Sequence, residues 1–129
     1  MHSGGDQVRG SEICLIQSIE ALSESGFNLV VLRRHGVLDE HIAGQVSRIL
    51  DEPFPEIMFD GSHRSLPLID YLQSAHRLFQ LARSLKPAAI YCNTGLPCQL
   101  AVPVGRLLKI PVLCHFHHPA SKRYFYFGW

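Results

Sequence analysis

The stretch from residue 85 to residue 118, LKPAAIYCNTGLPCQLAVPVGRLLKIPVLCHFHH, decides the fold class of this chain. Residues 88–92 and 111–114 are short apolar runs, typical of strands that are buried on both faces. Between them, Pro97 opens a helical pattern. The residues of that helix expected to point inward are Leu100, Ala101, Val104 and Leu107. A strand, a helix and a second strand in this order predict two parallel strands joined by a crossover helix.

The same alternation extends toward the N-terminus. Residues 11–25 predict a helix, with Ser11 as N-cap and Gly26 as the residue after its end. Residues 28–32 predict a buried strand, and residues 56–59 a weaker one. A second helix is indicated by the spacing of Leu38, Ile42, Val46 and Ile49. A third, long helix has Ser65 as its expected cap and Pro67 in its first turn, and it stops at Lys86. Its expected apolar stripe is Leu68, Leu72, Ala75, Phe79 and Ala82.

Together these elements predict an α/β fold with a Rossmann-like parallel sheet and helices on both faces. We expect one domain over residues 1–129, because no linker divides the chain. Such a fold ordinarily begins with a strand, whereas this chain begins with a glycine-rich loop, so a first strand is expected to be missing. Residues 124–129 hold five of the 12 aromatic residues. Both ends therefore indicate a truncated piece of a larger protein.

Composition excludes several classes of protein. Hydrophobic residues make up 47% and charged residues 18% of the chain, which excludes intrinsic disorder. The formal net charge of +1 argues against a nucleic-acid partner. No apolar run is long enough for a transmembrane segment, although peripheral contact with a membrane stays open. The first residues do not resemble a signal peptide, and we expect a cytoplasmic protein.

The cysteines and histidines give no metal-binding pattern. The cysteines are Cys14, Cys92, Cys98 and Cys114, and no two have the C-x-x-C spacing. We interpret them as reduced core residues. His115 and His117 share a face of the last strand, but no further ligand is fixed near them, so neither a metal nor a cofactor is expected. A single histidine acting on a hydroxyl is the favoured interpretation.

Polar residues follow the strands of the predicted sheet. In open parallel sheets, ligands bind beyond the carboxyl ends of the strands. Asn93 and Thr94 follow one strand, and the histidines follow the last. The loop before the first helix could bind a ligand, because glycine lets backbone N–H groups approach a sugar or phosphate closely. Its residues of interest are Gly4, Gly5, Arg9 and Gly10. The alternative is a flexible turn with no ligand.

Four segments resemble the family-four-type glycosyltransferases of GT-B fold. They are residues 4–12 (GGDQVRGSE), 26–32 (GFNLVVL), 85–93 (LKPAAIYCN) and 108–117 (LKIPVLCHFH). The resemblance implies the N-terminal, acceptor-side domain of an enzyme that moves a sugar from a nucleotide-sugar donor to an acceptor hydroxyl. The glycines at 4, 5 and 10 would line the cleft, with Arg9 among them. His117 would be the catalytic residue beside the transferred sugar, and Asn93 and Thr94 would reach the acceptor.

The chain departs from the family pattern in three places. Either Gly4-Gly5 or Arg9-Gly10 can be the family's glycine pair, Ala88 replaces an aspartate, and His115 and His118 compete with His117. The family's donor-binding C-terminal domain has no counterpart here, so we expect the isolated chain to be inactive. Two alternatives remain: a non-catalytic nucleotide- or phosphate-binding module, and a subunit that pairs with a separate catalytic chain.

Overall fold

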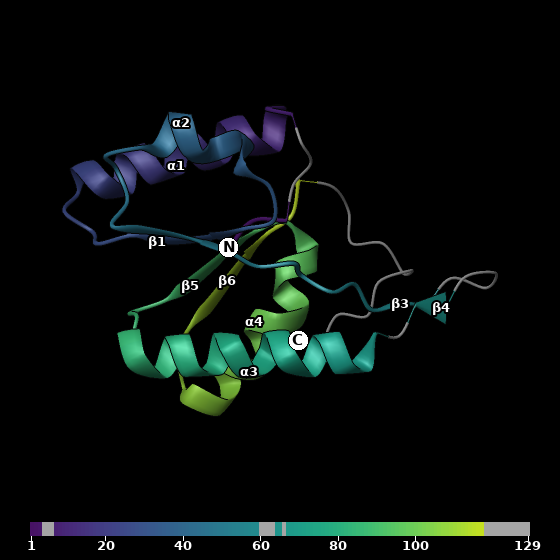
Figure 1. Cartoon of the computed structure of the whole chain (residues 1–129). Helices are drawn as coiled ribbons and strands as arrows, with labels where there is room; N and C mark the ends of the chain where they lie inside the picture. The colour runs from purple at the N-terminus through teal and green to yellow at the C-terminus, as the bar shows by residue number, and fades with distance from the viewer. Residues whose placement is uncertain (4–6, 60–63, 66, 118–129) are drawn as a thin grey trace. The chain divides into compact units, whose positions relative to one another are not determined.

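A computed structural model describes residues 1–3, 7–59, 64–65 and 67–117 (Figure 1). The chain divides into two compact units, Met1–Pro53 and Phe54–Trp129. Each is an α/β arrangement with one parallel strand pair. The expected α/β fold with parallel strands is therefore confirmed. The aromatic residues at 124–129 lie outside the described residues.

The first unit pairs two strands and carries two helices. Its elements are α1 (Gly10–Glu24), β1 (Val30–Arg33), the 3-10 turn η1 (Gly36–Leu38), α2 (Asp39–Ile42) and β2 (Arg48–Asp51). Strands β1 and β2 are parallel, with Val31 opposite Ile49 and Leu32 opposite Leu50. Helix α1 follows the prediction closely, with Leu15 and Ile19 buried and Gly26 at a φ of +81°.

The segment before α1 pairs with the end of β1 at one residue, His2. His2 forms an isolated parallel bridge with Arg33, in which its N–H donates to Leu32 O at 2.9 Å. The N–H of Arg34 in turn donates to His2 O at 3.2 Å. One residue thus occupies the place in the sheet where the alternation predicts a strand, and it is followed by the loop that leads to α1.

The predicted second helix is wrong beyond Ile42. Helix α2 ends there, and Ile49 lies in strand β2. Gly44 has a φ of +83°, a conformation that ends a helix and that glycine adopts without a steric penalty. The helical spacing that continues to Ile49 is coincidental, because β2 is a short strand paired to β1.

The second unit is built around one strand–helix–strand crossover. It contains β3 (Met58–Phe59), β4 (Arg64–Ser65), α3 (Leu68–Leu85), β5 (Ile90–Asn93), α4 (Gly95–Leu108) and β6 (Val112–His115). Strands β5 and β6 are parallel, while β3 and β4 form a small antiparallel pair. Helix α4 packs on β5 and β6, and α3 packs on α4 (Figure 1).

The buried face of α3 lies one position before the predicted stripe. Tyr71, Ser74 and Leu78 are buried, whereas Leu68 and Leu72 are 57% and 65% exposed. Ala82 is buried as predicted. Ser65 belongs to β4 and Pro67 is the N-cap, so the proposed serine cap is also wrong. The predicted stripe places Leu68 and Leu72 inward, whereas α3 buries Tyr71, whose hydroxyl contacts α4.

That choice follows from a proline in α4. Pro103 lies inside the helix and lacks the N–H that would bond to the carbonyl of Gln99. The Tyr71 hydroxyl donates to Gln99 O at 2.8 Å and satisfies it. The Gln99 side chain, also fully buried, accepts from Ile57 N–H at 3.0 Å and donates to Ile57 O at 2.8 Å. Burial raises the pKa of Tyr71 to about 12, so its hydroxyl stays a donor at neutral pH.

Leu107 was predicted to point inward and does not, being 71% exposed. Gly105 faces β6 in its place, and the two prolines of α4 leave the helix intact from Gly95 to Leu108.

Candidate functional site

The carboxyl ends of β5 and β6, called the rim below, bring together two predicted site residues, Asn93 and His117, and the neighbouring His115. Asn93 is the last residue of β5, is fully buried, and stands opposite His115 in the strand register. His117 follows two residues after His115, and its Nε2 lies 2.9 Å from Asn93 Oδ1. An amide oxygen only accepts hydrogen bonds, so His117 donates from Nε2. The hydrogen bond therefore holds the histidine ring at the strand ends.

His115 takes a different place on the same rim. It is exposed, and its Nδ1 lies 2.7 Å from the Tyr91 hydroxyl. The rings of His115 and His117 are 4.3 Å apart between centroids, at 38°. The prediction that these two histidines share a face agrees with this contact. His118, the third competitor, lies outside the described residues.

Thr94 joins β5 to α4 in a strained conformation. Its φ of +144° and ψ of +168° lie in a region that L-residues other than glycine rarely adopt. It is the N-cap of α4, so the positive end of the helix dipole begins at this turn. A strained backbone next to a buried amide and a histidine is the kind of geometry found at binding sites.

The glycine loop is described only in part. Gly4 and Gly5 lie outside the described residues. Arg9 is exposed and forms the N-cap of α1, and its Nη2 donates to Gln7 Oε1 at 3.2 Å. Gly10 is the first residue of α1, and a Cβ added there would meet no atom within 4 Å. Packing within the described residues therefore does not require glycine at position 10.

Glu12 has a structural role at the start of α1. It is 2% exposed, and its Oε2 accepts from Arg9 N–H at 3.1 Å and from Ser11 Oγ at 2.9 Å. Its Oε1 lies 3.0 Å from His2 Nε2. Burial alone would raise the pKa of this carboxyl, but the hydrogen bonds and His2 outweigh it and lower the pKa. The predicted cap Ser11 is wrong, because Arg9 is the cap and Ser11 supports Glu12.

Three cysteines converge beneath the rim, which the sequence analysis did not foresee. The sulfurs of Cys92, Cys98 and Cys114 all lie within 4.8 Å of one another. Hydrogen bonds from the other two thiols lower the pKa of Cys114 to about 4. The contact with Cys114 raises the pKa of Cys92 to about 12, and the same contact raises that of Cys98. These three cysteines have no C-x-x-C spacing because they come from β5, α4 and β6.

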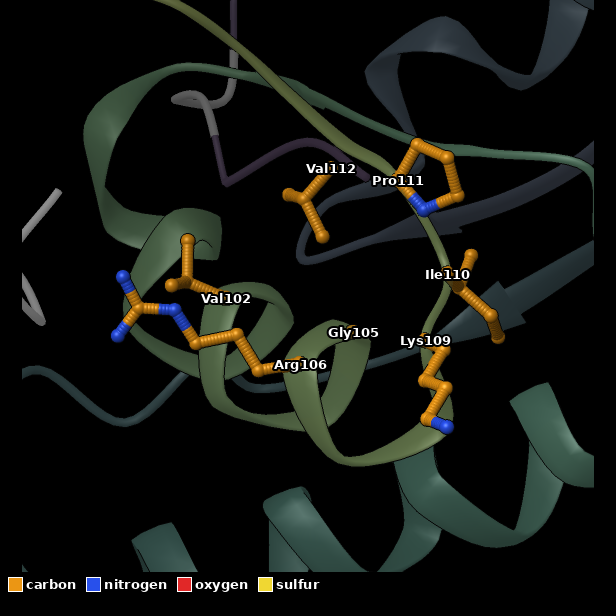
Figure 2. A pocket seen from close by; sticks show the side chains of 7 residues that line it. All are labelled: Val102, Gly105, Arg106, Lys109, Ile110, Pro111 and Val112. Atoms are coloured by element: carbon orange, nitrogen blue, oxygen red, sulfur yellow. The ribbon is translucent and has the colours of Figure 1, made fainter.

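A pocket of about 360 Å³ lies at the other end of the crossover (Figure 2). It is lined by Val102, Gly105, Arg106, Lys109, Ile110, Pro111 and Val112. These residues belong to the second half of α4, to the connection at 109–111 and to the first position of β6. The pocket is thus at the amino end of β6, away from the edge at which parallel sheets bind ligands.

The comparisons with known proteins concern the fold. No family model matches the sequence, and no curated protein matches it. The structure is similar to a crystal structure of MurG from Acinetobacter baumannii, with a TM-score of 0.67 and 20% identity. This similarity shows that the chain has an α/β fold like that of the matched part of MurG. The similarity covers 92% of this chain but only 35% of MurG, so the chain spans about a third of that protein's length.

Among the helices of the described residues, none is long and apolar enough to cross a membrane. The likeness to MurG supports a GT-B glycosyltransferase-like fold without singling out family four. The roles of Gly4, Gly5, Arg9, Gly10, Asn93, Thr94 and His117 in ligand binding stay predictions.

Proposed function

We propose that this chain is the acceptor-side half of a family-four-type glycosyltransferase, which moves a sugar from a nucleotide-sugar donor to an acceptor hydroxyl. The fold supports this proposal at the level of architecture. The observation that carries it further is the 2.9 Å contact between His117 Nε2 and Asn93 Oδ1 at the strand ends. A histidine oriented at this edge is suited to contact a sugar hydroxyl.

In this proposal His117 is the catalytic residue and Asn93 is its positioning residue. Asn93 is fully buried and its amide oxygen already receives the histidine N–H. In place of the predicted contact between Asn93 and the acceptor, we propose that Asn93 acts through His117, by fixing the tautomer and the plane of the ring. Thr94, half-buried at the start of α4, is proposed to contact the acceptor. Because Nε2–H is given to Asn93, the neutral ring presents Nδ1 as an acceptor for a sugar hydroxyl, and a fixed acceptor needs less reorganisation when the proton moves.

The glycine loop and a further domain complete the proposal. Gly4, Gly5, Arg9 and Gly10 are proposed to bind a sugar or phosphate through backbone N–H groups and the Arg9 side chain. A C-terminal domain holds the nucleotide and diphosphate. The location we assign is the cytoplasm, which rests on the interpretation of the cysteines as reduced thiols.

The experiment replaces His117 in the longer polypeptide that contains both halves. We expect His117→Ala to lower kcat by about 100-fold or more, which is the usual contribution of one positioned acid–base side chain. Asn93→Ala is expected to lower kcat less than His117→Ala and to change the pH profile, because the ring loses its fixed tautomer. Release of nucleoside diphosphate with acceptor present is the measurement.

His76→Ala is the matched control, since His76 is an exposed histidine on α3. It should leave kcat unchanged. Full activity of the His117→Ala enzyme would overturn the catalytic assignment. Tight nucleotide binding by the 129-residue chain without any transfer by the longer enzyme would favour the nucleotide-binding module instead.

A further inference from the structure

Three thiols meet in the core of the second unit, apart from any role in sugar transfer. Cys92 lies on β5 and Cys114 lies directly opposite it on β6. Cys98 reaches them from the first turn of α4. Cys92 is fully buried, Cys98 is 1% exposed and Cys114 is half-buried. Three soft ligand atoms from three elements thus share one small volume, which their mutual distances of at most 4.8 Å define.

We propose that Cys92, Cys98 and Cys114 form a three-thiolate binding site for a single Zn²⁺ ion. A zinc–sulfur bond is about 2.3 Å, so the sulfurs of a tetrahedral site lie about 3.8 Å apart. The observed separations exceed this by no more than about 1 Å. Rotation of the cysteine side chains can close that difference without moving the strands.

The charge of the site selects a divalent ion. Three thiols lose their protons on binding, three Zn–S bonds form, and a water molecule completes four-coordination. Three thiolates around Zn²⁺ leave one net negative charge, whereas a monovalent ion such as Cu⁺ would leave two in the core, at a higher desolvation cost. The first turn of α4 favours that remaining charge, because Cys98 lies near the positive end of the helix dipole.

The half-buried position of Cys114 provides the way in. The other two sulfurs are covered, so an ion and its water would enter from the side of β6 on which Cys114 is partly exposed. A bound ion would tie β5, α4 and β6 together one residue before Asn93 and one before His115. The site would therefore stabilise the scaffold of the rim, since its ligands come from all three elements.

The test uses the whole 129-residue chain, reduced and freed of metal under anaerobic conditions. Titration with Zn²⁺ should show one ion per chain by mass spectrometry of metals. Titration with Co²⁺ should give a sulfur-to-cobalt charge-transfer absorption of the strength expected for three thiolates. Cys114→Ser should weaken zinc binding by at least about 100-fold, more than loss of an outer-shell partner costs. It should also lower the cobalt absorption by about one third.

Cys14→Ser is the matched control, because Cys14 is a half-buried cysteine of α1 in the first unit. It should bind zinc as the unaltered chain does. Far-ultraviolet circular dichroism shows whether each variant is folded, and if Cys114→Ser is not, Cys114→Ala replaces it. Zinc binding of unaltered affinity in the folded Cys114 variant would overturn the proposal. So would binding of Cu⁺ without binding of Zn²⁺.

Discussion

Gly105 lies in the interior of α4, where glycine ordinarily weakens a helix by about 1 kcal/mol relative to alanine. At position 105 we expect the opposite, that alanine destabilises the fold relative to glycine. A Cβ at this position would collide with Cγ2 of Val112 and come within 2.9 Å of Ile110 O. We expect Gly105→Ala to destabilise the chain by about 1–3 kcal/mol, the usual cost of overpacking. Urea denaturation measures it.

Gly10 supplies the matched control for that substitution. It is also a helical glycine, but a Cβ there meets nothing within 4 Å. Gly10→Ala should therefore leave the free energy of unfolding unchanged or raise it by up to about 1 kcal/mol. Equal effects of the two substitutions would show that the close approach of α4 to β6 is not what requires glycine at 105.

At the scale of the element, the start of α1 depends on one buried carboxylate. The hydrogen bonds and His2 lower the pKa of Glu12 from 4.5. A carboxyl whose pKa is lowered by folding stabilises the fold above its unfolded pKa, and that stabilisation is lost as the pH falls below about 4.5. Glu12→Gln should cost about 1 kcal/mol at pH 7, as loss of a helix cap does. It should also flatten the pH dependence of thermal unfolding below about 4.5.

The control for Glu12 is Glu20→Gln, at an exposed position of the same helix. It should leave both the stability at pH 7 and its acid dependence nearly unchanged. Asp39 adds a second acid-sensitive contact, because its hydrogen bonds from Arg33 lower its pKa from 3.8. Some loss of stability in acid therefore remains in Glu12→Gln. An unaltered acid profile in that variant would contradict the role given to Glu12.

Elements could be predicted where hydrophobic spacing and local chemistry agree. Helix α1 and the β5–α4–β6 crossover satisfy both conditions, and they were predicted within a few residues. The second helix was predicted too long because the helical spacing of apolar residues continues to Ile49. The positive φ of Gly44, which ends the helix, cannot be inferred from that spacing. The face of α3 was misjudged because Tyr71 is buried to satisfy a carbonyl that Pro103 frees. That pairing is non-local, so periodicity within one helix does not contain it.

At the scale of the molecule, the predicted topology was enough to bring Asn93 and His117 together, but it did not reveal the cluster of three cysteines. The rule that ligands meet the carboxyl ends of parallel strands correctly put Asn93 and His117 on one rim. The thiols of Cys92, Cys98 and Cys114 meet for the same topological reason, yet their spacing in the sequence matches no metal-binding motif. Their convergence needed the register of β5 against β6, which only the structure supplies.

The last prediction concerns the chain on its own. Transfer from a nucleotide sugar releases a diphosphate, whose growing negative charge must be stabilised in the transition state. The segments at the carboxyl ends of β5 and β6, residues 91–98 and 112–117, contain no lysine or arginine, so Arg9 is the single cation that the proposed site offers to a diphosphate. The cations of this unit's pocket, Arg106 and Lys109, lie at the opposite end of the crossover. We therefore expect the isolated 129-residue chain to release no nucleoside diphosphate from any nucleotide sugar, with or without an acceptor. Acceptor-dependent release by the pure chain, abolished by His117→Ala, would show that one half suffices for catalysis.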